Sequence, residues 1–264
     1  MLKLVNLNKT FNPGTINEKK AIVDLSLTIN DGDFITVIGG NGAGKSTMLN
    51  LISGVYPVDS GYIIMDGKNI TDTSEHKRAK YLGRVFQDPL YGTAANMEIA
   101  ENLAIALHRG KRKTLRWAVT NKERKFFEEE LKRLDLGMEK RLTVKVGLLS
   151  GGQRQALTLL MATMKRPNLL LLDEHTAALD PKTAAKVLEL TEEMTSEENL
   201  TTLMITHNMS DAIRYGNRLI MMNEGSIIYD VSGEEKKNLT VADLLEKFES
   251  TVGSKLENDR MLLQ

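Results

Sequence analysis

An eight-residue loop constrains the fold of this chain more than any other feature. The loop reads GGNGAGKS, from Gly39 to Ser46, and fits the pattern G-x-x-x-x-G-K-[S/T]. It follows the apolar stretch DFITVIG, which predicts a buried parallel strand, and it precedes a helical pattern. A strand, a glycine-rich loop and a helix in this order place backbone N–H groups around a phosphate. The sequence therefore predicts a P-loop α/β core.

Each part of this loop has an expected role toward a nucleotide. Backbone N–H groups around Gly42 to Lys45 are expected to wrap the α- and β-phosphates. Lys45 is expected to bridge the β- and γ-phosphate oxygens, and the Ser46 hydroxyl to ligate Mg²⁺. The predicted nucleotide-binding residues of the loop are Gly39, Gly40, Asn41, Gly42, Ala43, Gly44, Lys45, Ser46 and Thr47.

A second apolar stretch, LLLLDE, ends in two carboxylates, Asp173 and Glu174. In a P-loop enzyme the first carboxylate after such a strand holds the Mg²⁺ shell, so Asp173 is the predicted metal ligand together with Ser46. Successive residues of a strand point to opposite faces, so the two acids are expected to do different work. We assign Glu174 to polarise the attacking water.

The stretch LLSGGQRQALTLL places Ser150, Gly151 and Gly152 at the start of a helical pattern. The first turn of a helix has N–H groups without internal partners, and its dipole adds partial positive charge there. Glycines allow a ligand to come close to these groups. The stretch therefore predicts a second anion site, and the residues alone leave the identity of the anion open.

The order of the remaining elements defines the fold class. Strands, helices and a terminal hairpin alternate along the chain after the phosphate loop, which predicts a RecA-like parallel-sheet core. An N-terminal antiparallel β subdomain precedes this core, and a helical segment is inserted into it. The expected strands are 23–29, 33–39, 61–67, 169–173 and 201–207, the expected helices include 122–137 and 182–194, and the expected hairpin is 217–231 with its turn at 223–225.

Composition excludes several classes of function. The chain has 264 residues with 35 basic and 35 acidic side chains, so its neutral balance gives no reason to expect a nucleic acid as partner. The absence of cysteine excludes disulfides and thiol chemistry. The N-terminus lacks a signal-peptide pattern, and no apolar run approaches the roughly 20 residues of a membrane span. A protein of this kind that works at a membrane needs a separate chain to cross it.

Taken together, these motifs resemble those of the ATP-binding-cassette (ABC) ATPases. The family signature LSGGQ is present unaltered as residues 149–153, and the resemblance extends over about residues 2–235. It implies that the second anion is the γ-phosphate of an ATP bound by the opposite subunit of a head-to-tail dimer. Ser150, Gly151, Gly152 and Gln153 are the residues that the resemblance places against this ATP.

The same resemblance implies four further site residues. Phe11 matches the aromatic residue that stacks on adenine, and Gln87 matches the glutamine that reaches Mg²⁺ and the water. Asp180 matches the aspartate that couples the two sites of the dimer. His207 matches the histidine that contacts the γ-phosphate, so it joins Glu174 and Lys45 among the expected catalytic residues.

The resemblance also implies the domain organisation. It predicts a single ATPase domain over residues 1–250, with a core of about 1–88 and 166–235 and a helical insert of about 89–165. A polar C-terminal tail, 251–264, follows. The basic segment His108–Trp117 is either a contact for anionic groups of a membrane or membrane subunit, or a solvated loop; we favour the loop.

The function that the resemblance implies is ATP hydrolysis, with ATP and Mg²⁺ as cofactors, coupled to membrane transport. The expected partners are a second copy of the chain, integral membrane permease subunits and an extracytoplasmic solute-binding protein. The expected location is peripheral, on the cytoplasmic side of the membrane. Import of a small solute, with amino-acid-like solutes among the candidates, is favoured. The alternatives are an exporter ATPase and a soluble ABC ATPase acting in assembly or on nucleic acid.

Overall fold

The computed structural model describes residues 1–111 and 119–252, and these residues form two compact units. The first unit combines Met1–Arg78 with the chain from Thr201 onward, and the second is Ala79–Leu200. The mixed α/β architecture expected from the sequence is confirmed in both units. The domain boundaries expected from the family remain a prediction. The division into units does not test them, because the second unit contains strands as well as helices.

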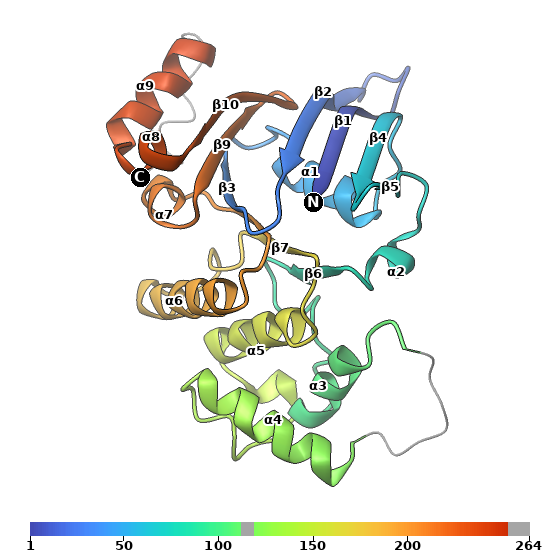
Figure 1. Ribbon diagram of the computed structural model, residues 1–264, viewed down its shortest axis with the longest axis vertical. Helices are drawn as coiled ribbons and strands as arrows, with labels where there is room; N and C mark the ends of the chain where they lie inside the picture. Colours follow the sequence, from blue (N-terminus) through green and yellow to red (C-terminus); the bar gives the residue numbers. More distant parts are fainter. Residues whose placement is uncertain (112–118, 253–264) are drawn as a thin grey trace. The chain divides into compact units, whose positions relative to one another are not determined.

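In the first unit, an antiparallel sheet is built from the N-terminal part of the chain (Figure 1). Its strand order is β2-β1-β4-β5. Apolar residues alternate with polar ones along β2, so one face of this strand is buried, as its sequence predicts. The strands are β1 (Leu2–Phe11), β2 (Lys19–Ile29), β4 (Ser60–Met65) and β5 (Lys68–Asn69).

The first unit also contains strands in the order β10-β9-β3-β8. β3 runs parallel to both β8 and β9, and its residues Ile35 to Ile38 are buried, as expected for a central strand of an α/β core. The strands are β3 (Phe34–Ile38), β8 (Thr202–Ile205), β9 (Arg218–Asn223) and β10 (Ser226–Ser232). The helices are α1 (Lys45–Ser53), α2 (Glu75–Arg78), α7 (Met209–Arg214), α8 (Gly233–Lys237) and α9 (Val241–Val252).

The terminal hairpin forms where the sequence predicts it. β9 and β10 pair antiparallel, and Glu224 and Gly225 between them have φ of 45° and 84°. Two successive positive φ angles suit the tight turn that joins two twisted strands. Apolar residues of this hairpin and of α7 and α9 then pack into one cluster with Ile38 of β3.

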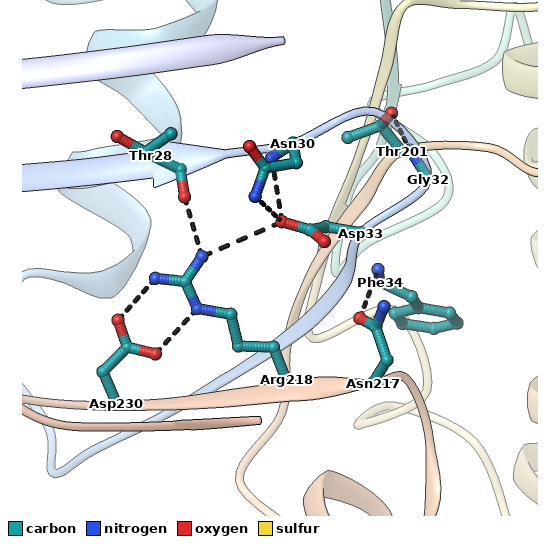
Figure 2. A network of polar contacts seen from close by, with 9 residues as sticks. All are labelled: Thr28, Asn30, Gly32, Asp33, Phe34, Thr201, Asn217, Arg218 and Asp230. Atoms are coloured by element: carbon teal, nitrogen blue, oxygen red, sulfur yellow. Dashed lines mark hydrogen bonds and ion pairs between the residues drawn. The ribbon is translucent and has the colours of Figure 1, made fainter. Parts of the chain in front are cut away.

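A polar network ties β2 to β9 and β10 within the first unit (Figure 2). The Arg218 guanidinium donates two hydrogen bonds to the carboxylate of Asp230 and one, of 2.7 Å, to the Thr28 carbonyl. Asp33 lies 3.8 Å from the same guanidinium and accepts a hydrogen bond from the Asn30 backbone. Hydrogen bonding to Asp230 raises the pKa of Arg218 further, so this side chain stays charged.

The second unit combines a pair of parallel strands with helices. Its strands are β6 (Leu82–Val85) and β7 (Leu169–Asp173). Its helices are α3 (Ile99–Leu107), α4 (Asn121–Arg133), the 3₁₀ turn η1 (Val146–Leu148), α5 (Gly151–Thr163) and α6 (Pro181–Glu197). α4 buries Phe127 and Leu131, the face that its sequence predicts.

One helix end differs from the sequence expectation. α4 ends at Arg133 and Asp135 already has φ of 51°, so the chain leaves the helix before Gly137. α9 ends at Val252, and the expected tail boundary at 251 remains a prediction. The rest of this tail, and most of the basic segment His108–Trp117, lie outside the described residues. Among the helices that the structure describes, none is long and apolar enough to cross a membrane.

Candidate nucleotide-binding and hydrolysis site

The phosphate loop of the first unit connects β3 to α1 and has a backbone that requires glycine. Gly39 has φ of 149°, and a Cβ there would lie 2.2 Å from the Met222 carbonyl oxygen. Gly44 has φ of 100°, and a Cβ there would lie 2.6 Å from the Ala21 carbonyl oxygen. Both positions therefore need glycine because the backbone of neighbouring strands comes so close.

Lys45 lies inside the loop. Its side chain is buried, and the ammonium donates hydrogen bonds to the carbonyls of Gly39, at 2.6 Å, and Gly40, at 3.1 Å. The Lys45 ammonium is thus bonded to carbonyls of its own loop, whereas Asn41, Gly42 and Ser46 are exposed. The N-cap of α1 is Gly44, which has no side chain to cap the helix, and the first turn contains no acidic residue. This end of α1 keeps its partial positive charge for an anion.

His207 lies at the same edge as the loop. β3 and β8 are parallel, and Val37 pairs with Ile205. Gly39 and His207 each follow two residues later, so both lie beyond the carboxyl ends of adjacent strands. His207 is exposed there, and Asn208 after it caps α7 by accepting a hydrogen bond of 3.1 Å from the Asp211 backbone. Asn208, the residue after the histidine, is thus the N-cap of α7.

Phe11 ends β1 and is half-buried. Its ring meets the Tyr56 ring edge-on at 5.2 Å between centroids, and the Lys9 ammonium lies 5.8 Å from its centroid. These contacts hold the ring in the first unit. Stacking on adenine remains a prediction for this residue.

In the second unit, Asp173 is the last residue of β7 and pairs with an arginine that the sequence analysis missed. The Arg84 guanidinium lies 3.5 Å from the Asp173 carboxylate, and both side chains are only 14% exposed. Arg84 also stacks on Phe86, at 4.5 Å from the ring centroid. In the register of β6 and β7, Arg84 pairs with Leu171, so Asp173 two residues later shares its face. No pattern in the sequence alone indicated that an arginine would lie beside this expected metal ligand.

Glu174 does not continue the strand. Its φ is 47°, in the left-handed region, so the expected alternation of Asp173 and Glu174 between two faces does not describe this pair. The next residue, His175, is buried and its Nε2 lies 3.1 Å from the Thr191 hydroxyl oxygen of α6. Burial lowers the pKa of His175 to about 4, so this ring is neutral near pH 7.

Asp180 and Gln87 are both exposed. Asp180 is the N-cap of α6 and accepts a hydrogen bond of 3.1 Å from the Thr183 backbone. Hydrogen bonds from Thr183 lower the pKa of Asp180. Gln87 follows Phe86, whose carbonyl accepts a hydrogen bond of 3.3 Å from the buried Gln155 of α5. The backbone before Gln87 is therefore anchored to the signature helix.

The signature motif forms a capping box at the start of α5. The Gln153 backbone donates to the Ser150 hydroxyl at 3.3 Å, and the Ser150 backbone donates to the Gln153 side chain at 3.2 Å. Gly152 is buried, and a Cβ there would lie 2.1 Å from the Thr183 methyl group. Gly151 is exposed. Part of the motif thus serves the packing of α5 on α6, which the anion-site interpretation did not include.

The predicted residues are therefore divided between the units. The phosphate loop, Phe11 and His207 belong to the first unit, and the carboxylates, Gln87, Asp180 and the signature motif to the second. Within each unit the structure places them on loops at the ends of strands or the starts of helices.

Comparison with known proteins identifies the family. The family model of the ABC transporters matches residues 22–177. The tyrosine transport ATP-binding protein of Clostridioides difficile (strain R20291) is 48% identical over 96% of this chain and 100% of its own length. The spermidine/putrescine import ATP-binding protein PotA of Haemophilus influenzae is 34% identical over 96% of this chain, which spans 65% of PotA.

Solved ABC cassettes have the same fold. The dimeric cassette MJ0796 bound to ADP and Pi superposes with a TM-score of 0.75 at 29% identity, over 88% of this chain and 98% of that one. The ADP form of the cassette MJ1267 gives 0.76 at 28% identity, over 96% and 99%. The chain belongs to the ABC transporter family. It is an ATP-binding subunit of that family and hydrolyses ATP.

Proposed function

We propose that this chain powers the import of an amino-acid-like solute, with tyrosine as the first candidate. The observation that carries the proposal is the 48% identity to a tyrosine transport ATP-binding protein over 96% of this chain and 100% of that protein. The PotA relatives, named for spermidine and putrescine import, are less similar and longer. An amino acid is therefore favoured over a polyamine.

The proposed assembly contains two copies of this chain. The dimer of MJ0796 supports it, as does the exposed Gly151 at the start of the signature helix. The two copies attach to permease subunits at the cytoplasmic side of the membrane, and an extracytoplasmic binding protein delivers the solute. ATP binding closes the dimer and hydrolysis releases it, so the bound nucleotide switches the two copies between a closed and an open state.

Within each copy, the residues divide the work on ATP. The N–H groups of the phosphate loop bind the phosphates, and the Lys45 ammonium exchanges its loop carbonyls for phosphate oxygens. Glu174 takes the proton of the attacking water, and His207 holds the γ-phosphate end. Phe11 stacks on adenine, and Asp180 links the two sites through the start of α6.

Mg²⁺ fits the proposed ligands. The side chains of Ser46, Gln87 and Asp173 all offer oxygen atoms, the donors that this ion prefers. When bound, the ion neutralises charge that develops on the β- and γ-phosphates. The Arg84 guanidinium, 3.5 Å from the Asp173 carboxylate, would orient this proposed ligand.

Replacing Glu174 with glutamine tests the catalytic assignment. The variant keeps the size of the side chain and loses the base, so we expect ATP turnover to fall at least about 100-fold, in line with the usual contribution of a general base. ATP-bound dimer should accumulate on size exclusion. The matched control is Glu189→Gln, at an exposed position of α6, which should behave as wild type. Wild-type turnover in Glu174→Gln would show that the assignment is wrong.

Transport is tested in the native host. The tagged chain is purified from membranes in mild detergent, and a polytopic membrane protein is expected with it in near one-to-one ratio. A strain that lacks the chain should regain uptake of radiolabelled tyrosine with wild type or Glu189→Gln, and not with Glu174→Gln. Recovery without any membrane protein would contradict the transporter assignment and favour a soluble cassette. Restored uptake of spermidine alone would contradict the solute.

A further inference from the structure

A lysine outside the phosphate loop lies directly against it. Lys19 is the first residue of β2, and its ammonium nitrogen lies 3.1 Å from the point that a Cβ on Gly42 would occupy. Its Cε atom lies 4.0 Å from the same point. Gly42 has φ of 79° and stands between the loop start and Lys45. A second ammonium group therefore reaches the loop from the antiparallel sheet.

The pairing of β1 and β2 explains this reach. Phe11 pairs with Lys19, and directly opposite residues of an antiparallel pair project from the same face. The face that carries the ring expected to stack on adenine thus also carries this lysine. Lys20, which pairs with Thr10, is the next residue along the strand and projects from the opposite face.

The charge of Lys19 has no acidic partner within the parts of the chain that the structure describes. Ion pairs there are formed by other lysines, such as Lys9, whose ammonium lies 2.7 Å from Asp59. The neighbouring Glu18 is directed to the Gly14 backbone, whose N–H donates to it at 2.6 Å. Lys19 therefore adds an uncompensated positive charge beside a loop that binds anions.

We propose that Lys19 is a second cationic contact for the phosphates of ATP. Lys45 acts from inside the loop, where it is buried, and Lys19 acts from the exposed side over Gly42. A lysine ammonium binds phosphate as a point charge and can reach it from a flexible stem. The inference rests on the proposed placement of ATP at this loop, and it adds a residue that lies outside the loop pattern.

The test compares Lys19→Gln with Lys20→Gln in the full chain. Both variants remove one positive charge from the same strand, and only the first removes it beside the loop. Affinities are measured by calorimetry for the non-hydrolysable ATP analogue AMP-PNP, for ADP and for adenosine, each at two NaCl concentrations. We expect Lys19→Gln to bind AMP-PNP about 10-fold more weakly, as the loss of a charge-assisted hydrogen bond implies, and adenosine as wild type does.

The salt dependence gives a second readout, because a charge contact is screened by ions. AMP-PNP binding by Lys19→Gln should lose less affinity between low and high NaCl than binding by wild type or Lys20→Gln. Lys19→Arg should retain most of the affinity. Unfolding without nucleotide should be the same for both glutamine variants, since both positions are exposed.

Two results would overturn the proposal. Equal AMP-PNP affinities of Lys19→Gln and Lys20→Gln would show that Lys19 does not touch the phosphates. An equal loss for adenosine and AMP-PNP would show that it acts on the base or the fold. A separate variant, Lys45→Ala, tests the proposed placement of ATP: if it binds AMP-PNP as wild type does, the placement of ATP at the loop is wrong, whatever the result for Lys19.

Discussion

Replacing Gly152 with alanine should destabilise the protein, whereas the same change at the neighbouring Gly151 should not. Both glycines begin the signature helix, and neither has a positive φ. They differ in surroundings. A Cβ on Gly152 would lie 2.1 Å from the Thr183 methyl carbon, and one on Gly151 would lie 3.4 Å from its nearest neighbour, a methyl carbon of Leu179. The first distance is far inside van der Waals contact and the second is ordinary contact.

The two variants should therefore differ in stability, and only Gly152→Ala should lower it. Alanine in the middle of a helix is favoured over glycine by roughly 0.5–1 kcal/mol, and this is the upper limit of the gain at these two positions in the first turn of α5. Forcing an extra methyl group into a packed site costs about 1–3 kcal/mol. For Gly152→Ala the sum is a net loss of about 1–2 kcal/mol. For Gly151→Ala it lies between zero and a gain of about 1 kcal/mol.

Urea unfolding of the full chain measures both values, with the midpoint as readout at an unchanged slope. Thr183→Ser supplies the control, because serine lacks the methyl group that Gly152→Ala would meet. Its backbone N–H can still donate to Asp180. In the double variant Gly152→Ala/Thr183→Ser, most of the loss should be recovered, a coupling of about 1 kcal/mol. Equal midpoints for the two glycine variants, or no coupling with Thr183, would refute the packing argument.

Three further changes should follow from contacts in the two units. Arg84→Met should lower the free energy of unfolding in urea by about 2–3 kcal/mol, because the Asp173 carboxylate loses its partly buried partner, and adding Asp173→Asn should recover part of this loss. For His175, whose pKa falls from 6.5 to about 4 on burial, the unfolded chain binds a proton that the folded chain does not. The free energy of unfolding should therefore be highest above pH 6.5 and decline by up to about 3 kcal/mol as the pH falls to 4. His175→Gln, whose side chain can still form a hydrogen bond with Thr191, should flatten this decline. An unchanged pH profile in this variant would contradict the assignment. Lys236→Met should lower the free energy of unfolding by about 2–3 kcal/mol and speed hydrogen exchange in α7. The reason is that the Lys236 ammonium donates hydrogen bonds of 2.8, 2.6 and 2.9 Å to three carbonyls at the end of that helix. Exchange at the wild-type rate would contradict this.

The sequence predicted those features that depend on neighbours along the chain. The phosphate loop needs its glycines because of local backbone angles, and the turn at Glu224 and Gly225 follows the same kind of rule. The buried strand of Leu169 to Leu172 reads directly as an apolar run. These elements require no knowledge of what packs against them.

Contacts between residues far apart in the chain could not be predicted from the sequence. Arg84 and Asp173 lie far apart in the chain, and only the register of β6 and β7 places them on one face. The glycines of the signature motif show the same limit, because the pattern could not reveal that Gly152 packs against Thr183. The sequence did contain one local signal that we did not use. Ser150 and Gln153 have capping-box spacing, which predicts that the serine hydroxyl also caps its own helix.

Glu174 shows how packing can place a residue that alternation along a strand cannot. β7 ends at Asp173, and Glu174 adopts a left-handed backbone that costs a residue with a Cβ about 1–2 kcal/mol. Such a conformation persists only where its surroundings impose it. The next side chain, His175, is buried and bonded to Thr191 of α6. Because His175 cannot move without losing these contacts, its burial holds the backbone of Glu174. The side chain proposed to activate water is thus positioned by the packing of its neighbour.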